Sequence, residues 1–320
     1  MIINVLISVI GFVVLIKSAD LFVDGASSFA KNLKIPTAVI GLTIVSFGTS
    51  APELAVAFNS HLSGNKDILY GNVIGSNIAN ILLILGVATL IAPLSIKGDI
   101  IKKEIPILLL MTLGFSVLFS DSLFDVRQAN TLTRADGIIL ILLFSVFTYY
   151  LITVMNRDKR KKKPAEDEKP KYKVLPAILL FLGGLVGIIV SSSLIVDNIA
   201  EFADKIGISQ KIISVTIVSI GTSLPELVTT VIAAKKGETD IAIGNIVGSN
   251  IFNICIVLGI PVIILGDAAS SAFGITDTVF LILPVLFLWL FSATGRVLKK
   301  YEGVILLILY CAYNGYVLIQ

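Results

Sequence analysis

The chain has little of the side-chain chemistry on which disulfide frameworks and transition-metal sites depend. Its 320 residues include two cysteines, one histidine and one tryptophan. Cys255 and Cys311 both fall in long apolar stretches without a disulfide or metal-ligand spacing, so we interpret them as packing residues. His61 lies at the end of such a stretch, and we interpret it as a loop residue rather than a ligand. Cysteine and histidine therefore give no indication of a metal site or a disulfide scaffold.

Charged residues are also scarce, and apolar residues are in excess. Only 15% of the residues are charged, 56% are hydrophobic, and the mean hydropathy is +0.96. A soluble domain of this length does not need so much apolar surface to fill its core. The composition therefore predicts an all-α membrane protein. Ten apolar stretches are long enough to cross about 30 Å of hydrocarbon as helices. They cover residues 3–24, 37–62, 68–92, 104–120, 136–155, 174–199, 210–235, 241–265, 276–294 and 302–319.

The basic residues indicate how these ten predicted transmembrane helices are oriented. The lysine-rich segment from Arg157 to Lys173 separates the fifth and sixth helices, and the positive-inside rule places it in the cytoplasm. The loops that are then cytoplasmic hold 19 Lys and Arg residues, the opposite side holds 5, and Lys17 lies within the first helix. We predict a first five-helix repeat over residues 1–155, a charged cytoplasmic linker over 156–173 and a second repeat over 174–320. Both termini are predicted to lie outside.

The two halves are related by an internal duplication. Thr43 to Glu53 reads TIVSFGTSAPE and Thr216 to Glu226 reads TIVSIGTSLPE, with 9 of 11 positions identical and a shift of 173 residues. Because an odd number of helices separates equivalent points, the second copy must enter the membrane from the opposite side. The sequence therefore predicts two inverted five-helix repeats, an arrangement typical of secondary transporters.

Each copy places hydroxyl groups and one carboxylate on a single face of its second predicted helix, at the spacing i, i+3, i+4 and i+7. Pro52 has no N–H for the carbonyl of Gly48, and Pro225 has none for Gly221, so we expect each helix to kink or break just before its glutamate. Freed carbonyls in a membrane need a partner, and a cation is one. A proline kink satisfied only by hydroxyls is the alternative, and it does not explain an acid at the same offset in both copies. The candidate residues are Ser46, Thr49, Ser50 and Glu53, matched by Ser219, Thr222, Ser223 and Glu226.

A second repeated motif, GNVIGSN at 71–77 and GNIVGSN at 244–250, carries amide and hydroxyl groups on the next helix of each copy. The members nearest the middle of their helices are interpreted as ligands or as neighbours of ligands: Ser76, Asn80, Ser249 and Asn253. The remaining amides are interpreted as interhelical packing: Asn72, Asn77, Asn245 and Asn250.

The two glutamates demand positive charge that the sequence does not supply at the same depth. Glu53 and Glu226 lie towards the middle of their predicted helices, whereas Lys17 lies towards a helix end. The compensating charge must therefore be mobile, either cations or protons. Carboxylate, hydroxyl, amide and carbonyl oxygens suit hard ions, and a flexible cage of about 6–8 oxygens suits Ca²⁺ better than Mg²⁺.

With these motifs, the chain resembles the cation/Ca²⁺ exchanger superfamily, and within it the prokaryotic sodium/calcium exchangers. The resemblance covers essentially the whole chain. It implies that Glu53 and Glu226 share a Ca²⁺ ion with backbone carbonyls of Ser46 and Ser219, and that neighbouring hydroxyls help to form Na⁺ sites. One departure concerns Asn80 and Asn253: some relatives carry Asp at one of these positions, whereas here both are Asn. The core then has two carboxylates, which leaves stoichiometry and K⁺ use open.

The expected function is secondary active antiport of Ca²⁺ for Na⁺, by alternating access at a midplane site, in a prokaryotic plasma (inner) membrane. A Ca²⁺/H⁺ exchanger and a K⁺-dependent Na⁺/Ca²⁺ exchanger are alternatives of the same class. From other classes, a cation channel would use similar oxygens without a counter-ion, and an intramembrane hydrolase is disfavoured because metal-ligand motifs are missing. We expect no enzymatic activity, no cofactor, no nucleic acid and no obligatory protein partner; the partners are Ca²⁺, Na⁺ and the lipid bilayer, with H⁺ or K⁺ in the alternatives.

Overall fold

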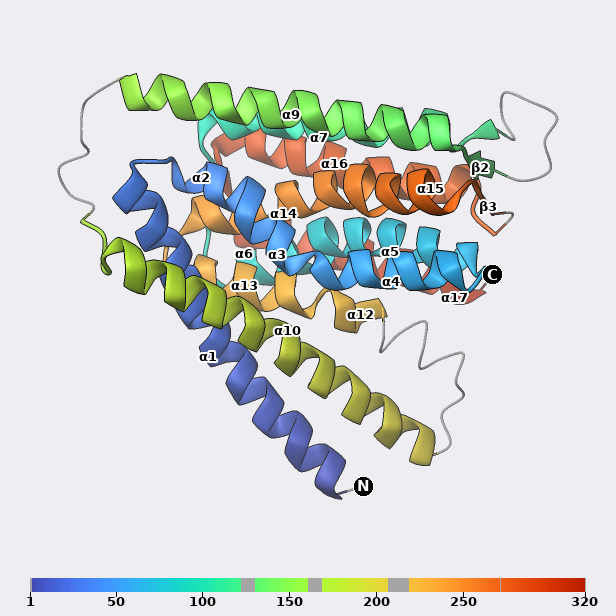
Figure 1. The fold of residues 1–320 in the computed structure, drawn as a ribbon, viewed down its shortest axis with the longest axis horizontal. Helices are drawn as coiled ribbons and strands as arrows, with labels where there is room; N and C mark the ends of the chain where they lie inside the picture. Colours follow the sequence, from blue (N-terminus) through green and yellow to red (C-terminus); the bar gives the residue numbers. More distant parts are fainter. Residues whose placement is uncertain (1, 122–129, 161–168, 207–218, 271, 320) are drawn as a thin grey trace.

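The computed structural model describes residues 2–121, 130–160, 169–206, 219–270 and 272–319, and these residues form an almost entirely helical molecule (Figure 1). A bent pair, Thr37–Thr49 with Ala51–Leu62, could cross a membrane as one span, with 44° between its halves. By length and composition, six further helices could do so: Ile3–Leu33, Lys66–Ile91, Arg134–Asn156, Val174–Lys205, Thr239–Leu265 and Ile275–Gly295. The chain is therefore a mostly helical membrane protein with about six strongly apolar helices.

Helices occupy all ten stretches that the sequence predicted to cross the membrane. In chain order they are α1 (Ile2–Leu33), α2 (Thr37–Ile40), η1 (Gly41–Val45), α3 (Ser46–Thr49), α4 (Ala51–Leu62), α5 (Lys66–Ala79), η2 (Asn80–Ile84), α6 (Leu85–Ile91), η3 (Ile100–Glu104), α7 (Ile105–Leu118), α9 (Arg134–Arg160), α10 (Val174–Lys205), α12 (Ser219–Thr222), α13 (Leu224–Lys235), α14 (Thr239–Phe252), η5 (Asn253–Val257), α15 (Gly259–Leu265), α16 (Ile275–Gly295) and α17 (Lys300–Ile319). The η segments are π-helical turns.

Several of these helices are shorter or longer than predicted. The helix α7 continues η3 without a break, so the two cover Ile100–Leu118, whereas α13 has 12 residues and is shorter than the roughly 20 residues that a span normally requires. Residues 210–218 of the predicted seventh span lie outside the described residues. The helix α9 continues through Arg160, beyond the predicted end of the first repeat at residue 155. That all ten segments cross the membrane stays a prediction.

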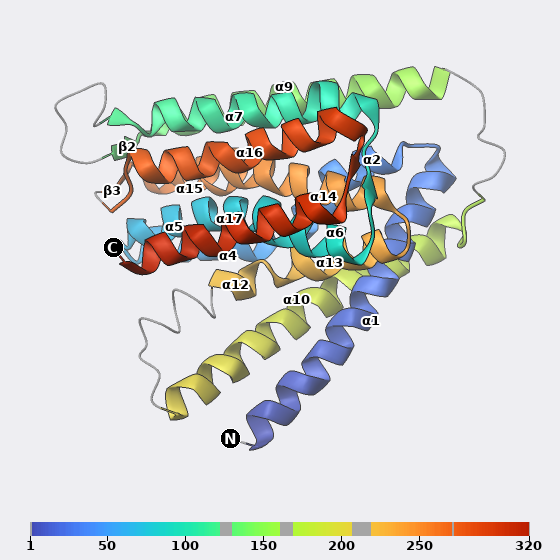
Figure 2. The ribbon, with the colours of Figure 1, turned by 180° about the vertical axis from the view of Figure 1, so that it is seen from behind.

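The helices are arranged with α7, α9 and α16 on one side of the bundle and the diagonal pair of α1 and α10 on the other (Figures 1 and 2). The helices α1 and α10 approach each other closely because glycine lies at their contact. A Cβ atom on Gly184 would lie 2.6 Å from the backbone nitrogen of Phe22, and one on Gly25 would lie 2.5 Å from that of Phe181. The rings of Phe22 and Phe181 stack beside these contacts, with centroids 4.7 Å apart.

The helix α14 lies in the centre of the bundle, and every residue from Ile241 to Phe252 is buried. Its two glycines admit the backbone of η1 and its neighbours. A Cβ atom on Gly244 would lie 3.0 Å from the Cα atom of Gly41, and one on Gly248 would lie 2.7 Å from the carbonyl oxygen of Leu42. This close approach brings the motif of the second repeat against the broken helix of the first, which is where the candidate site forms.

Equivalent segments of the two halves run in opposite directions. In Figure 1, the chain runs from right to left through α5 and α6, and from left to right through their counterparts α14 and α15. Two short antiparallel sheets join loops of the two halves. The strand β1 (Leu94–Ser95) pairs with β4 (Val297–Leu298), and β2 (Asn130–Leu132) pairs with β3 (Ala268–Ser270).

Candidate ion-binding site

Both predicted helix breaks are present in the structure. The helices α3 and α4 are separated at Ser50 (φ −86°, ψ 9°), and α12 and α13 are separated at Ser223 (φ −88°, ψ 4°). Pro52 and Pro225 follow in the first turn of the next helix, where a missing N–H costs little. The breaks therefore arise from the local sequence, as expected.

Each break is followed directly by a buried glutamate. Glu53 lies in the first turn of α4 and is 0% exposed, while Glu226 lies in the first turn of α13 and is 1% exposed. The two carboxylates are close enough to repel each other. The residue at the helix break of the first repeat contacts the glutamate of the second: the Ser50 hydroxyl donates to Glu226 Oε1 at 2.8 Å. The structure thus brings the two predicted acids together from the two halves of the chain.

The two carboxylates have different hydrogen-bond partners. Glu226 Oε1 accepts from Ser50 and, at 3.4 Å, from the Ser249 hydroxyl. Within the described residues, Glu226 Oε2 and both carboxylate oxygens of Glu53 have no hydrogen-bond partner. The Ser223 hydroxyl, the counterpart of Ser50, donates to the hydroxyl of Ser76 at 3.3 Å. The hydroxyls of Thr222 and Ser223 lie near the Glu53 carboxylate without reaching hydrogen-bond geometry. Three buried carboxylate oxygens are therefore left for a cation.

The remaining hydroxyl candidates lie around this pair. The Thr49 hydroxyl is 3.1 Å from Asn245 Oδ1 and 3.5 Å from the Ser249 hydroxyl. The carbonyl of Ser46 accepts from the backbone N–H of Ser50 at 3.0 Å and faces the Thr49 hydroxyl at 3.3 Å, while the Ser46 hydroxyl donates to the carbonyl of Thr43. The Ser46 carbonyl therefore already has one protein donor, the N–H of Ser50. The backbone of Ser219 begins α12, and its side chain lies outside the described part.

The two candidate asparagines each begin a π-helical turn. Asn80 starts η2 and Asn253 starts η5, at equivalent positions of the two repeats. Such turns are rare and occur frequently at functional sites. Asn80 donates to Asn250 Oδ1 at 3.1 Å. The Asn253 amide is 0% exposed, and neither of its polar atoms has a partner among the described residues.

Sequence reasoning assigned several residues to packing that lie beside the glutamates. Asn72 donates to the backbone carbonyl of Glu53 at 3.1 Å, and Asn245 lies 3.5 Å from that of Glu226. Both contacts do join helices, as predicted, but they do so at the candidate site. The separation of 19 residues from glutamate to asparagine in both copies is a signal that could have identified them. Asn77 was also assigned to packing, yet both of its buried amide atoms lack a partner in the described structure.

His61 does not lie in a loop as the sequence analysis expected. It occupies the last turn of α4 and is 3% exposed. The helix ends at Leu62, the predicted end of the apolar stretch, and the chain turns at Ser63 and Gly64, where Gly64 has a φ of +79°. Eight residues of helix rise about 12 Å, so His61 and the turn after it lie well away from Glu53.

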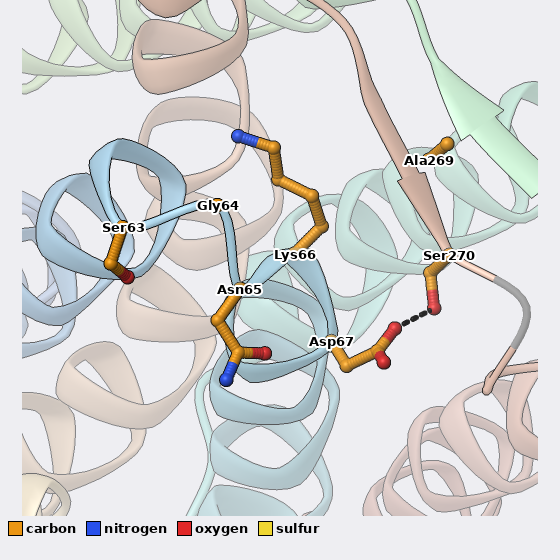
Figure 3. A pocket seen from close by; sticks show the side chains of 7 residues that line it. All are labelled: Ser63, Gly64, Asn65, Lys66, Asp67, Ala269 and Ser270. Carbon is orange, nitrogen blue, oxygen red and sulfur yellow. Dashed lines mark hydrogen bonds between the residues drawn. The ribbon is translucent and has the colours of Figure 1, made fainter.

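A surface hollow at the same turn is separate from the buried glutamates. It is lined by Ser63, Gly64, Asn65, Lys66, Asp67, Ala269 and Ser270 (Figure 3). The Ser270 hydroxyl donates to Asp67 at 2.5 Å, which joins the end of β3 to the start of α5. We therefore interpret the polar residues of the hollow as a structural contact between the two repeats.

The ligand set at the glutamates is suited to a hard cation. The described residues contain no group of three or more His, Cys, Asp or Glu side chains that could hold a metal ion. Two carboxylates, several hydroxyls and amides without sulfur or imidazole are typical of alkali and alkaline-earth ion sites. The arrangement provides two buried carboxylates for a cation.

Comparisons with known proteins agree with this chemistry. The chain is 37% identical to the inner membrane protein YrbG of Escherichia coli over 87% of this chain and 86% of that protein. It is 33% identical to the sodium/calcium exchanger MaX1 of Methanosarcina acetivorans over 97% of both chains. Its fold is similar to a solved structure of the sodium-calcium exchanger NCX_Mj soaked with Na⁺ and Ca²⁺, with a TM-score of 0.84, 29% identity and 98% coverage of each chain. Residues 3–153 and 176–319 match the sodium/calcium exchanger protein family. The chain therefore belongs to the sodium/calcium exchanger protein family.

Proposed function

We propose that this protein is a secondary active antiporter that exchanges Ca²⁺ for Na⁺ by alternating access at one site shared by its two repeats. The observation that carries this proposal is the contact between the repeats at the buried acids. Ser50 of the first repeat donates to Glu226 of the second, while Glu53 keeps both of its carboxylate oxygens free of hydrogen bonds in the described structure. A site of this kind attracts cations and needs both halves to be complete.

Exchange rather than leakage follows from the charge of the empty site. With both acids ionised, the site carries about two uncompensated negative charges in a low-dielectric environment, at a cost of several kcal/mol per ion. The conformational change that moves the site from one side of the membrane to the other is therefore unfavourable without bound cations. One Ca²⁺ ion, Na⁺ ions or protons would lower this barrier, so the carrier returns only when it is loaded.

The ligands proposed for the transported ions are the glutamates and the oxygen groups around them. Glu53 and Glu226 bind Ca²⁺, and the surrounding groups complete the Ca²⁺ and Na⁺ positions. These groups are Ser46, Thr49, Ser50, Ser76, Asn80, Ser219, Thr222, Ser223, Ser249 and Asn253. No cofactor or covalent step is needed, because the transported ions are the only participants.

The proposed placement in the membrane follows the duplication. Ten transmembrane helices form two inverted five-helix repeats in the inner membrane, with both termini outside and the linker over 156–173 in the cytoplasm. The opposite directions of α5–α6 and α14–α15 support the inversion (Figure 1), and the distribution of Lys and Arg supports the orientation.

The test is Ca²⁺ uptake into proteoliposomes that contain the purified protein. An outward Na⁺ gradient is compared with K⁺ and H⁺ gradients of the same size. Uptake driven by Na⁺ alone is expected, whereas uptake that follows only the pH gradient would replace the proposal with Ca²⁺/H⁺ exchange. A requirement for K⁺ together with Na⁺ would indicate K⁺-dependent exchange. Ca²⁺ flux that needs no counter-ion would indicate a channel.

A further inference from the structure

The two amides that follow the glycines of the repeated GN motif make the same contact in both halves of the protein. Asn72 donates to the backbone carbonyl of Glu53 at 3.1 Å, and Asn245 is 3.5 Å from the backbone carbonyl of Glu226. Asn72 is 8% exposed and Asn245 is 0% exposed. Because the contact occurs twice at equivalent positions, it belongs to the design of the site rather than to one accidental side-chain orientation.

Each of these amide contacts is made to the first turn of a helix, where the backbone has fewer hydrogen bonds within its own helix than it has further along. The helix breaks at Ser50 and Ser223, so the turn that carries each glutamate is continuous with its own helix on the C-terminal side only. An amide from the neighbouring helix, α5 or α14, fixes the backbone of the glutamate itself. By fixing the backbone of the glutamate, the amide also limits where the carboxylate of that glutamate can lie.

Besides its contact with the Glu226 backbone, Asn245 makes two further hydrogen bonds. Its Oδ1 accepts the hydroxyl of Thr49 from the first repeat at 3.1 Å, and its Nδ2 donates to the hydroxyl of Thr230 at 3.0 Å. The single hydrogen of the Thr49 hydroxyl has two acceptors within reach, Asn245 Oδ1 at 3.1 Å and the Ser46 carbonyl at 3.3 Å. When this hydrogen goes to Asn245, the nearer acceptor, the lone pairs of the Thr49 oxygen are free for a cation. One buried side chain therefore links the glutamate backbone of the second repeat to a hydroxyl of the first.

We propose that Asn72 and Asn245 are positioning residues of the ion site, which hold the two glutamate backbones, and that Asn245 also orients the Thr49 hydroxyl towards the bound cation. Neither amide is a ligand in this assignment. The inference deepens the proposed function and rests on it, because it supposes that Glu53 and Glu226 bind the transported Ca²⁺.

The experiment measures ⁴⁵Ca²⁺ binding to purified protein together with its thermal unfolding temperature. Asn245→Ala is expected to raise the Kd for Ca²⁺ about tenfold, the effect of losing a buried hydrogen bond near charge. Asn72→Ala tests the same contact in the other repeat, which keeps the proposal falsifiable if Asn245→Ala does not fold. The control is Asn314→Ala, which removes a similar bond from an amide to the Tyr310 carbonyl in α17 and is expected to leave the Kd unchanged.

A double-mutant cycle separates positioning from general packing. Thr49→Ala should weaken Ca²⁺ binding in the wild-type background and have a smaller effect in the Asn245→Ala background, because the Thr49 hydroxyl is no longer oriented there. Additive effects, or a lower unfolding temperature with an unchanged Kd, would overturn the inference. If the wild-type protein binds no Ca²⁺, the proposed function fails and the inference fails with it. If the wild-type protein binds Ca²⁺ and both asparagine variants match it, only the inference fails.

Discussion

The two buried glutamates are equivalent in sequence but not in their surroundings. Glu226 receives hydroxyl hydrogen bonds from Ser50 and Ser249, while Glu53 receives none from the described residues. A hydroxyl that donates to a carboxylate partly compensates its charge, and a carboxylate without a donor depends fully on a cation or a proton. Two acids in one site can therefore contribute unequally to the binding of the same ion.

We expect Glu53→Gln and Glu226→Gln each to reduce Na⁺-driven Ca²⁺ uptake at least 100-fold, in line with the loss of a charged hydrogen-bond or ion contact worth about 3 kcal/mol. Each change removes one of the two buried charges that we propose as Ca²⁺ ligands. The amide has nearly the same size as the carboxylate, so the protein should still fold. Uptake into proteoliposomes provides the measurement.

The matched control for these changes is Glu201→Gln on α10. Glu201 is exposed and pairs with Lys205 within the same helix at 2.5 Å. Exposed pairs of this kind contribute little to stability, so uptake should remain close to that of the wild type. If either Glu53→Gln or Glu226→Gln transported as well as this control, the buried acids would be structural.

At the scale of secondary structure, the site depends on helices that stop and restart. The chain changes direction by 44° between the α2–α3 segment and α4. This bend aims the first turn of α4 at the interior, and Pro52 prevents the backbone from restoring a continuous helix because it has no N–H for the carbonyl of Gly48. The π-helical turns η2 and η5, on the neighbouring helices, begin at Asn80 and Asn253.

Replacing the proline tests the importance of this break. Pro52→Ala supplies the missing N–H, so α3 and α4 can join into a straighter helix and Ser50 moves away from Glu226. We expect uptake to fall about tenfold or more, the effect of losing one charge-assisted hydrogen bond, while the thermal unfolding temperature stays the same or rises. Uptake and thermal unfolding are measured on the same preparation.

Pro284→Ala serves as the comparison, because Pro284 is a buried proline inside the continuous helix α16. This change also restores an N–H within a helix but does not touch the glutamate turns. It should leave uptake unchanged. Normal transport by Pro52→Ala would mean that the bend at Ser50 is not needed for ion binding.

At the scale of the whole molecule, one end of the diagonal helix α1 is held to the bundle by charged groups. Lys236, which follows α13, lies 2.6 Å from Asp24 and 2.9 Å from Asp20. Lys31 lies 3.0 Å from Glu238, just before α14. A shift of 173 residues places Ser63 and Asn65 at the positions equivalent to Lys236 and Glu238. Those two neutral residues line the hollow in Figure 3, beside the charged Lys66 and Asp67.

Because these ion pairs hold α1 to the bundle at this end in the described conformation, breaking one of them should favour the access state that is open there. Lys236→Met is expected to shift the balance by about 1 kcal/mol, roughly fivefold, towards the state that is open at this end. The measurement is the ratio of the half-saturating Ca²⁺ concentrations on the two faces of oriented vesicles. Lys205→Met, which removes only an exposed pair on α10, is the control, and an equal ratio in both variants would contradict the prediction.

The predicted topology can be tested with single cysteines at three exposed positions. In a background without Cys255 and Cys311, an impermeant maleimide added to intact cells should label cysteines at Asn65 and Asp267 and leave one at Lys169 unlabelled. The reason is that five helices separate equivalent points, while Lys and Arg concentrate on one side. If Asn65 and Asp267 were on opposite sides, the repeats would be parallel and the shared midplane site would lose its basis.

Much of the candidate site could be predicted from the sequence because its determinants are local. The missing N–H of Pro52 and Pro225 breaks the helices wherever the rest of the chain lies, and the structure has both breaks at the predicted places. The repeat at a fixed shift identified Glu53 and Glu226 as a pair. The membrane class followed from composition alone, since an excess of apolar residues cannot be buried in a soluble domain of this size.

The tertiary structure decided which groups meet across the repeats. The contact of Ser50 with Glu226 and the contact of Asn245 with Thr49 join residues 176 and 196 positions apart, and no local pattern sets such pairings. They depend on how closely α14 approaches η1, which the absence of side chains at Gly41 and Gly244 permits. The sequence thus determined the acids and the helix breaks through backbone chemistry. Only the packing of the two halves determined which hydroxyls reach Glu226 and which amides reach the two glutamate backbones, because hydrogen bonds between distant residues are fixed by the distance between helices.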